Sequence, residues 1–151
     1  MHNFRVLVVD DETDFVETIV NRLNKRMLDA KGVESGEAAM DLLKQELFDV
    51  VLLDIKMPGG MDGIETLREI KRIQPFAEVL LLTGHASVET SIEGMRLGAF
   101  DYLLKPMKFD DLLMKMAQAF EKKAAHDKKI RDAKIHELTR YPSRVFEQDK
   151  K

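Results

Sequence analysis

Polar residues that could share one chemical task stand directly behind four apolar runs of this sequence. Asp10 and Asp11 end the run VLVVDD, and Asp54 follows VVLL. Thr83 and Lys105 follow two later runs, EVLLL and FDYLL. Taken alone, each residue has a simpler interpretation, because aspartates cap helices and begin turns, threonine suits a loop, and a lysine is usually a solvated charge. Whether the five residues act together depends on the elements that position them.

Apolar runs of strand length alternate with segments whose apolar residues recur at helical spacing. The expected strands cover residues 5–9, 28–33, 49–53, 78–82 and 100–104. The expected helices lie within residues 13–26, 35–46, 64–74, 87–98 and 109–120. We expect Ser35 and Ser87 to cap the second and fourth helices. An apolar stripe on the second helix is expected to consist of Met40, Leu43 and Leu47.

Strands that are apolar throughout and alternate with helices are typical of a parallel sheet covered on both faces. Right-handed crossovers then put the carboxyl ends of all strands at the same edge of the sheet. We therefore predict an α/β fold with a doubly wound, five-stranded parallel sheet, (βα)5, in the flavodoxin-like order 2-1-3-4-5. In this order the first and third strands are neighbours at the switch point, where such folds bind ligands. The five polar residues should converge on one crevice.

Three carboxylates in a small space repel one another unless a cation neutralises them. Mg²⁺ suits a site made of a few carboxylates and water, so it is the cofactor that we expect. A carboxylate held beside Mg²⁺ can attack phosphorus and form an aspartyl phosphate. Lys105 and Thr83 would supply donors for the phosphoryl oxygens, which is the positioning and charge neutralisation that phosphoryl transfer needs.

Four motifs carry a family resemblance. VVDDE, LLDIKMPGGMDGIE, LLTGHAS and DYLLKP stand in this order with the separations that the family shows. Each motif alone is modest, and their combination is specific. Over residues 4–122 the chain resembles the receiver domain of a two-component response regulator.

The resemblance implies the roles of the acidic residues. Asp54 would be the phosphoacceptor, and Asp10 and Asp11 would bind Mg²⁺ with it. The backbone carbonyl of Lys56 would complete the protein ligands. The resemblance also implies a cis peptide bond between Lys105 and Pro106, which would direct the lysine toward the crevice.

The resemblance gives the remaining residues a part in signalling. Lys105 would pair with the phosphoryl group, Thr83 would respond to it, and Tyr102 would be an aromatic switch that turns inward. Tyr102 can equally be a half-buried core residue. His85 is either a loop histidine or, with Lys56, a residue beside the phosphoryl group that tunes attack by water.

One motif departs from the family pattern. MPGGMDG contains one glycine more than the usual sequence after the acceptor. The additional residue lengthens the loop. Because glycine adopts positive φ at little cost, we expect the third helix to begin normally.

Composition limits the class of protein. The chain has 151 residues, a net charge of −3 and no cysteine, which excludes disulfides and thiolate metal sites. The apolar runs are too short to span a membrane, and no signal peptide is visible. We expect a soluble, cytoplasmic protein.

Charge divides the chain into two parts. Residues 1–120 contain 14 Lys and Arg against 21 Asp and Glu, whereas residues 121–151 contain 10 against 6. We assign residues 1–122 to the receiver domain and residues 123–151 to a basic, helical tail or linker that Pro142 ends. The tail is interpreted as a solvated extension, and a partner-binding helix is the alternative.

The resemblance implies a signalling switch rather than an enzyme. Its partners would be a sensor histidine kinase or phosphotransfer protein and an output protein or domain, with a homodimer through helix 4, strand 5 and helix 5 as one form. We expect no direct binding to nucleic acid or membrane. One alternative is a haloacid-dehalogenase-like phosphatase, which needs a second acid two residues after its aspartate nucleophile. Lys56 occupies that place after Asp54, and Glu12 occupies it after Asp10 without the usual following pattern. The other alternative is a receiver scaffold that is not phosphorylated.

Overall fold

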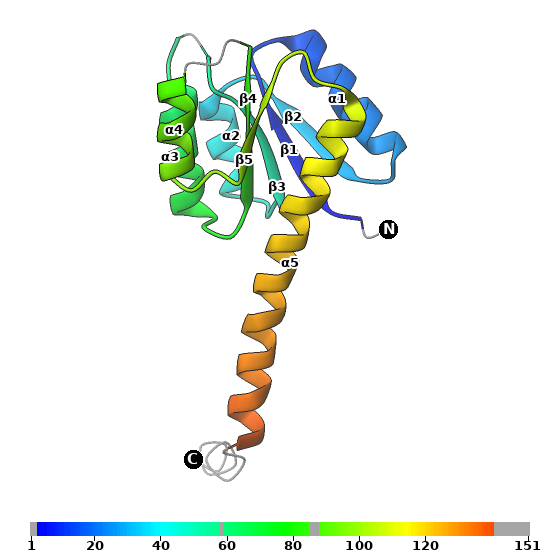
Figure 1. The fold of residues 1–151 in the computed structure, drawn as a ribbon, viewed down its shortest axis with the longest axis vertical. Helices are drawn as coiled ribbons and strands as arrows, with labels where there is room; N and C mark the ends of the chain where they lie inside the picture. The colour runs from blue at the N-terminus through cyan, green and yellow to red at the C-terminus, as the bar shows by residue number, and fades with distance from the viewer. Residues whose placement is uncertain (1–2, 58, 85–87, 141–151) are drawn as a thin grey trace.

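A computed structural model describes residues 3–57, 59–84 and 88–140 of the chain. Five strands alternate with five helices (Figure 1). The strands are β1 (Arg5–Val9), β2 (Asp29–Val33), β3 (Val50–Asp54), β4 (Glu78–Thr83) and β5 (Asp101–Leu104). The helices are α1 (Thr13–Lys25), α2 (Gly36–Leu43), α3 (Gly63–Ile73), α4 (Val88–Arg96) and α5 (Phe109–Arg140).

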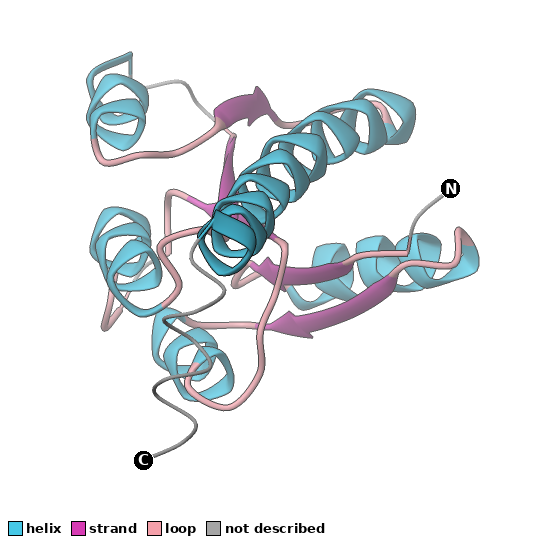
Figure 2. Cartoon of the chain, turned by 90° about the horizontal axis from the view of Figure 1, so that it is seen from below, coloured by secondary structure: helices cyan, strands magenta, loops and turns pink. Residues whose placement is uncertain are grey.

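The sheet is entirely parallel, and its strand order is β2-β1-β3-β4-β5, as predicted. Two core clusters lie on its opposite faces. One contains residues of α1 and α5, and the other contains residues of α2 and α3. Figure 2 shows the strands between these two layers of helices. The register pairs Val9 with Leu53 and Asp54 with Leu82, so neighbouring strands end at the same level.

Local sequence explains where several helices begin. The Ser35 hydroxyl accepts a hydrogen bond from the backbone N–H of Ala38 and caps α2, as predicted. Asp62 caps α3 by accepting from the backbone N–H of Glu65, so α3 begins normally after the longer loop. Ser87, the predicted cap of the fourth helix, lies outside the described residues.

The predicted stripe on the second helix was wrong at one residue. Helix α2 ends at Leu43, and Leu47 is 78% exposed, whereas Met40 and Leu43 are buried. The chain leaves α2 because a hydrogen-bonded turn follows at Gln45 and Glu46, which both donate to the carbonyl of Leu42.

The exposure of β5 differs from that of the inner strands. Its residues alternate between half-buried and exposed, as suits an edge strand.

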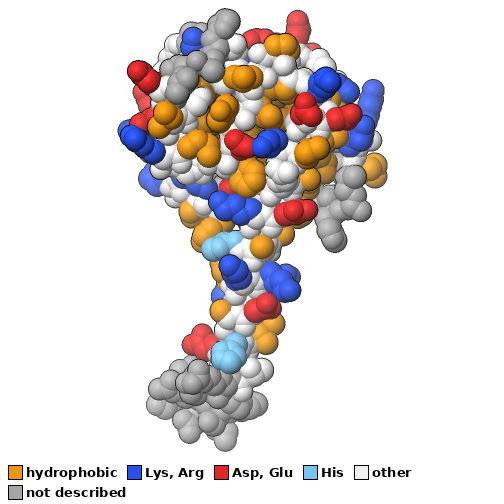
Figure 3. All heavy atoms as spheres, in the orientation of Figure 1, with side chains coloured by type: hydrophobic (Ala, Val, Ile, Leu, Met, Phe, Trp, Pro, Cys, Tyr) orange, Lys and Arg blue, Asp and Glu red, His pale blue; other side chains and the backbone are white. Residues whose placement is uncertain are grey.

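Helix α5 is continuous for 32 residues and passes residue 122 without interruption. Its first turns pack on the sheet through Phe109, Leu112 and Met116. Its later turns project away from the sheet and carry charged and histidine side chains, with hydrophobic ones between them, on the visible face (Figures 1 and 3). The structure thus supports a helical tail, while the domain boundary at residue 122 stays a prediction. Among the helices of the described residues, none combines the length and the apolar character that a membrane span requires.

Candidate functional site

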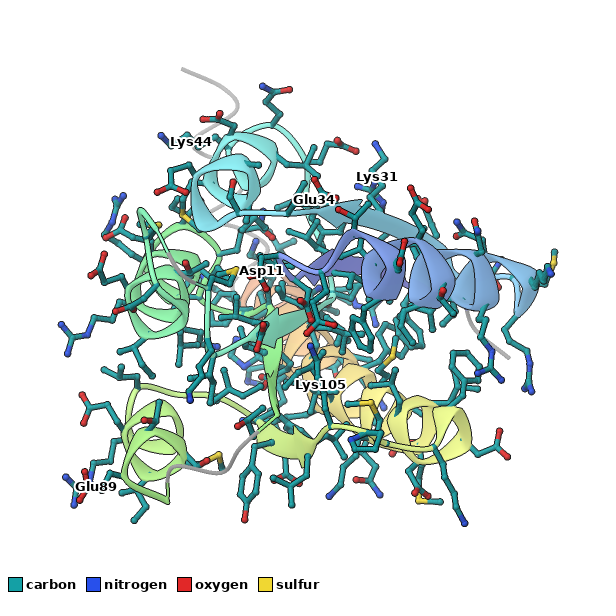
Figure 4. The ribbon with its side chains drawn as sticks, turned by 90° about the horizontal axis from the view of Figure 1, so that it is seen from above. Asp11, Lys31, Glu34, Lys44, Glu89 and Lys105 are labelled. Atoms are coloured by element: carbon teal, nitrogen blue, oxygen red, sulfur yellow. The ribbon has the colours of Figure 1, made fainter. Side chains whose placement is uncertain are left out.

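The acidic site lies at the carboxyl ends of the central strands. Asp10 follows β1, and Asp54 is the last residue of β3. Their side chains and that of Asp11 offer oxygen atoms that all lie within 4.8 Å of one another. The convergence predicted for the three aspartates is therefore confirmed. Figure 4, which looks onto this edge of the sheet, shows Asp11 and Lys105 near the centre, with Lys44 and Glu89 at the periphery.

Lys105 brings one positive charge into this site. Its ammonium group forms a short ion pair with Asp10 and lies 3.9 Å from Oδ2 of Asp54. The backbone N–H of Lys105 donates to the carbonyl of Thr83, which fixes the end of β5 beside that of β4. The peptide bond between Lys105 and Pro106 is cis, as the resemblance implied.

Burial separates the three carboxylates. Asp10 is fully buried and Asp54 is 5% exposed, whereas Asp11 is exposed. Burial, and then the negative charge of Asp10, raise the pKa of Asp54 to about 7 despite the nearby Lys105. Burial also raises the pKa of Asp10, although the hydrogen bond from Lys105 opposes this shift. Two buried carboxyl groups thus share one ammonium group, and the site has an excess of negative charge.

This charge excess is what a divalent cation would relieve. Within the described part of the chain, the three aspartates form the one cluster of His, Cys, Asp or Glu side chains that could hold a metal ion. All of their ligand atoms are carboxylate oxygens, and the exposed Asp11 leaves one side open to water. Hard oxygen ligands beside solvent fit Mg²⁺.

Backbone groups help to orient the two buried aspartates. The N–H of Glu12 donates to Oδ1 of Asp10 over 3.0 Å, and the N–H of Lys56 donates to Oδ1 of Asp54 over 3.2 Å. Each bond joins a carboxylate to the loop directly behind its own strand. The backbone of Lys56 is therefore next to Asp54, and the role of its carbonyl as a metal ligand stays a prediction.

The other predicted residues lie at different depths. Thr83 ends β4 and is 3% exposed, one residue beyond the partner of Asp54 in the sheet register. Tyr102 lies on the edge strand β5 and is 43% exposed, so its ring is outside the core in this structure. His85 lies outside the described residues.

Sequence reasoning did not assign a role to two neighbours of Lys105. The Phe15 ring lies 4.3 Å from the lysine Nζ, and Oε1 of Glu12 lies 3.8 Å from it. The hydrogen bond with Asp10 and the nearby carboxylates raise the pKa of Lys105, although burial, the largest single influence, acts in the opposite direction. The position of Glu12 directly after Asp10 and Asp11 in the sequence was a usable signal that it lies near Lys105. No sequence pattern indicated that Phe15 would contact the ammonium group.

Comparison with known proteins identifies the family. The family model described as "Response regulator receiver domain" matches residues 6–117. The chain belongs to the response regulator receiver family. A receiver domain is a signalling switch rather than an enzyme, and the acidic pocket of this receiver is of the kind that accepts a phosphoryl group on aspartate.

The receiver is similar to part of several larger regulators. It is 38% identical over 137 residues to the transcriptional regulatory protein ZraR of Escherichia coli strain K12. These residues make up 91% of this chain and 30% of ZraR. It is 36% identical over 117 residues to the regulatory protein AtoC of the same strain, covering 78% of this chain and 25% of AtoC. The receiver thus spans less than a third of the length of these relatives.

Solved structures agree with the fold. The receiver domain of NtrX from Brucella abortus superposes with a TM-score of 0.73 at 32% identity, covering 77% of this chain and 98% of that one. A CheY-like receiver domain protein from Methanospirillum hungatei JF-1 gives a TM-score of 0.79 at 27% identity, covering 83% and 99%.

Proposed function

We propose that this receiver is a phosphorelay switch in which Asp54 accepts a phosphoryl group from the phosphohistidine of a sensor histidine kinase or phosphotransfer protein. The observation that carries the proposal is the buried Asp54 carboxylate beside Asp10, Asp11 and the Lys105 ammonium. An oxygen of Asp54 attacks phosphorus, a P–O bond forms, the P–N bond breaks, and the histidine imidazole leaves.

Each neighbour of Asp54 has a distinct task in this reaction. Bound Mg²⁺ would neutralise the carboxylates and the phosphoryl oxygens. Asp10, Asp11, Asp54 and the backbone carbonyl of Lys56 would hold it. Lys105 supplies a positive charge for the phosphoryl oxygens on the other side of Asp54, and the Thr83 hydroxyl donates to one of them. Lys56 and His85 tune the access of water to the aspartyl phosphate.

The donor protein needs a surface next to the acceptor. An apolar groove of about 400 Å³ lies beside Lys105, between α1 and the start of α5. Its lining includes Phe15, Ile19, Met107 and Leu112. An apolar helix of the kinase or phosphotransfer protein could pack there and bring its phosphohistidine to Asp54.

The proposed output is a change of the surface formed by α4, β5 and α5. The negative charge on Asp54 attracts Thr83 and Lys105, and Tyr102 then rotates inward behind Thr83. This surface carries exposed apolar side chains at Ile92, Met95, Tyr102 and Leu104. Figure 3 shows hydrophobic side chains spread over the sheet-bearing part of the molecule on the face that includes these elements.

The partner on that surface is an output protein, an output domain or a second copy of the receiver. The transcriptional regulatory relatives support an output at the level of transcription. We propose a cytoplasmic location, no contact with the membrane, and no direct binding of nucleic acid by the receiver itself.

Intact mass spectrometry tests the acceptor. With Mg²⁺ and a small acyl phosphate, the wild type should gain one phosphoryl group, and Asp54→Asn should gain none. Asp41→Asn, an exposed position on α2, is the control and should react like the wild type. An undiminished gain by Asp54→Asn would contradict the assignment.

Asp11→Ala should weaken Mg²⁺ binding and slow the reaction while the fold persists.

Nuclear magnetic resonance tests the output. Beryllofluoride with Mg²⁺ should perturb amide signals along residues 83–110 more than those of α1 or α2. Thr83→Ala should reduce the distant part of this response and leave phosphorylation of Asp54 intact. Perturbations confined to the neighbours of Asp54, with α4 and Tyr102 silent, would refute this route.

A further inference from the structure

The loop between β3 and α3 contains two successive glycines with left-handed backbone conformations. Gly59 has φ of 77° and Gly60 has φ of 65°. By the family resemblance, one of them is the additional glycine of MPGGMDG. Because glycine has more conformational freedom than any other residue, this pair adds to the entropy that must be lost when the loop is held in one conformation.

The loop is attached to the acceptor site at its first residues. The N–H of Lys56 donates to Oδ1 of Asp54, and Met57 is 5% exposed and packs in the core. At the other end, the N–H of Gly63 donates to the carbonyl of Ile55 over 3.1 Å. A Cβ at Gly63 would lie 2.4 Å from that carbonyl oxygen, so the two ends of the loop are in close contact. One end of the loop is thus bonded to Asp54 itself, and the other end is bonded to Ile55, the residue directly after Asp54.

A side chain of α2 holds the glycine segment. Oε1 of Glu37 accepts a hydrogen bond of 2.7 Å from the backbone N–H of Met61. The Met61 amide holds the pKa of the Glu37 carboxyl below its usual value, so the acceptor is a carboxylate at neutral pH. The same oxygen lies 2.5 Å from the position that a Cβ at Gly60 would occupy.

Helix α2 is itself a firm support for this contact. Ser35 caps it, and a Cβ at Gly36 would lie 2.3 Å from Oγ1 of Thr66 and 3.1 Å from Cβ of Met61. The first turn of α2 therefore lies directly against α3 and against the end of the loop. Glu37 stands in this turn, so its carboxylate is presented from a fixed backbone.

We propose that Glu37 is a positioning residue of the acceptor site. Its hydrogen bond to Met61 fixes the glycine-containing loop, and through Lys56 it sets the affinity for Mg²⁺ and the lifetime of the phosphoryl group on Asp54. This inference rests on the proposed function. Without the bond, the loop samples more conformations, the Lys56 backbone leaves Asp54 more often, and water reaches the site more easily.

Three variants separate positioning from general stability. Glu37→Ala removes the acceptor, Glu37→Gln retains an oxygen at the same place, and Asp41→Ala removes another exposed acid of α2 as the control. Glu37→Ala should raise hydrogen exchange at the Met61 amide by roughly three- to tenfold. It should weaken Mg²⁺ binding and shorten the phosphoryl half-life by factors of about the same size. Glu37→Gln should restore most of both properties, and Asp41→Ala should match the wild type in thermal midpoint and in every readout.

The two glycines supply an internal comparison. Gly59→Ala and Gly60→Ala impose similar backbone conformations on alanine, but nothing lies within 4 Å of a Cβ at Gly59. Gly60→Ala should therefore displace Glu37 and reproduce the effects of Glu37→Ala, whereas Gly59→Ala should have a smaller effect. In a Glu37→Ala background the two alanine variants should become equivalent.

Two outcomes would overturn the proposal. One is unchanged Mg²⁺ affinity in Glu37→Ala although exchange at Met61 rises, which would mean that the loop contact does not reach the site. The other is an equal effect of Gly59→Ala and Gly60→Ala on Mg²⁺ affinity in the wild-type background. If Asp54 accepts no phosphoryl group in any variant, the proposed function fails, and exchange and Mg²⁺ affinity still decide the role of Glu37.

Discussion

The two ends of the sheet use the same types of residue in opposite ways. At the amino end, Arg5 bonds to Asp29 and Glu46, and Lys31 bonds to Glu46 as well. These partly exposed charges are paired, and the hydrogen bonds from Lys31 and Arg5 lower the pKa of Glu46. At the carboxyl end, burial raises the pKa of Asp54 to about 7. The amino end is arranged for stability, whereas the carboxyl end keeps unbalanced charge for a ligand.

The largest effect on stability is expected at a buried polar residue of the amino end. The Gln74 side chain accepts from the backbone N–H of Phe48 and donates to the carbonyls of Leu43 and Glu46. Gln74→Ala leaves these buried groups without their partners and should lower the free energy of unfolding by about 2–4 kcal/mol. Urea denaturation measures this loss. Gln45→Ala, an exposed control, should change it little, and Mg²⁺ affinity should stay the same in both variants.

The next effect has the opposite sign and belongs to the carboxyl end. Asp54→Asn removes a buried charge, so without Mg²⁺ it should raise the free energy of unfolding at pH 8 by roughly 1–3 kcal/mol. The folded state holds a proton on Asp54 up to a pKa of about 7, whereas the unfolded chain releases it near the usual 3.8. Wild-type stability therefore falls as pH rises through this window, and the advantage of Asp54→Asn grows with it. A wild type that is more stable than Asp54→Asn at pH 8 in a chelator would reverse the comparison.

The smallest effect is expected at an exposed ion pair of the amino end. Nζ of Lys31 lies 2.7 Å from Oε1 of Glu46, and the lysine side chain is 46% exposed. Water and salt screen such a pair, so Lys31→Ala should lower the thermal midpoint by no more than about 2 °C. A larger fall that persists in 0.5 M salt, about threefold above physiological ionic strength, would show that the amino end depends on this pair more than its exposure indicates.

The sequence predicted the strand ends of the site because that prediction needs only one-dimensional information. Alternating strands and helices imply a parallel sheet, and a parallel sheet brings the residues behind each strand to one edge. Asp10, Asp54 and Lys105 meet for this reason. The role of each residue within the site came from the family resemblance.

Contacts between distant segments could not be predicted in this way. The bond between Glu37 and Met61 joins residues 24 positions apart, and the bond between Gln74 and Phe48 joins residues 26 apart. Such pairs depend on how helices and loops pack, which periodicity does not encode. The prediction that Leu47 belongs to the apolar stripe of α2 was wrong for a related reason. The helical spacing of apolar residues continues in the sequence past the turn that ends α2.

The long helix α5 makes its last contacts with the sheet-bearing part of the molecule at the amino end of the sheet, and it projects beyond them. Lys123 lies 3.1 Å from Asp49, and the His126 ring lies 4.1 Å from that of Phe76, centre to centre. From there to Arg140 the helix extends for roughly 20 Å at 1.5 Å per residue. A tilt of one degree about these contacts would displace Arg140 by about 0.3 Å. A small rotation at the base, on the side of the sheet opposite Asp54, therefore becomes a displacement that grows along the helix.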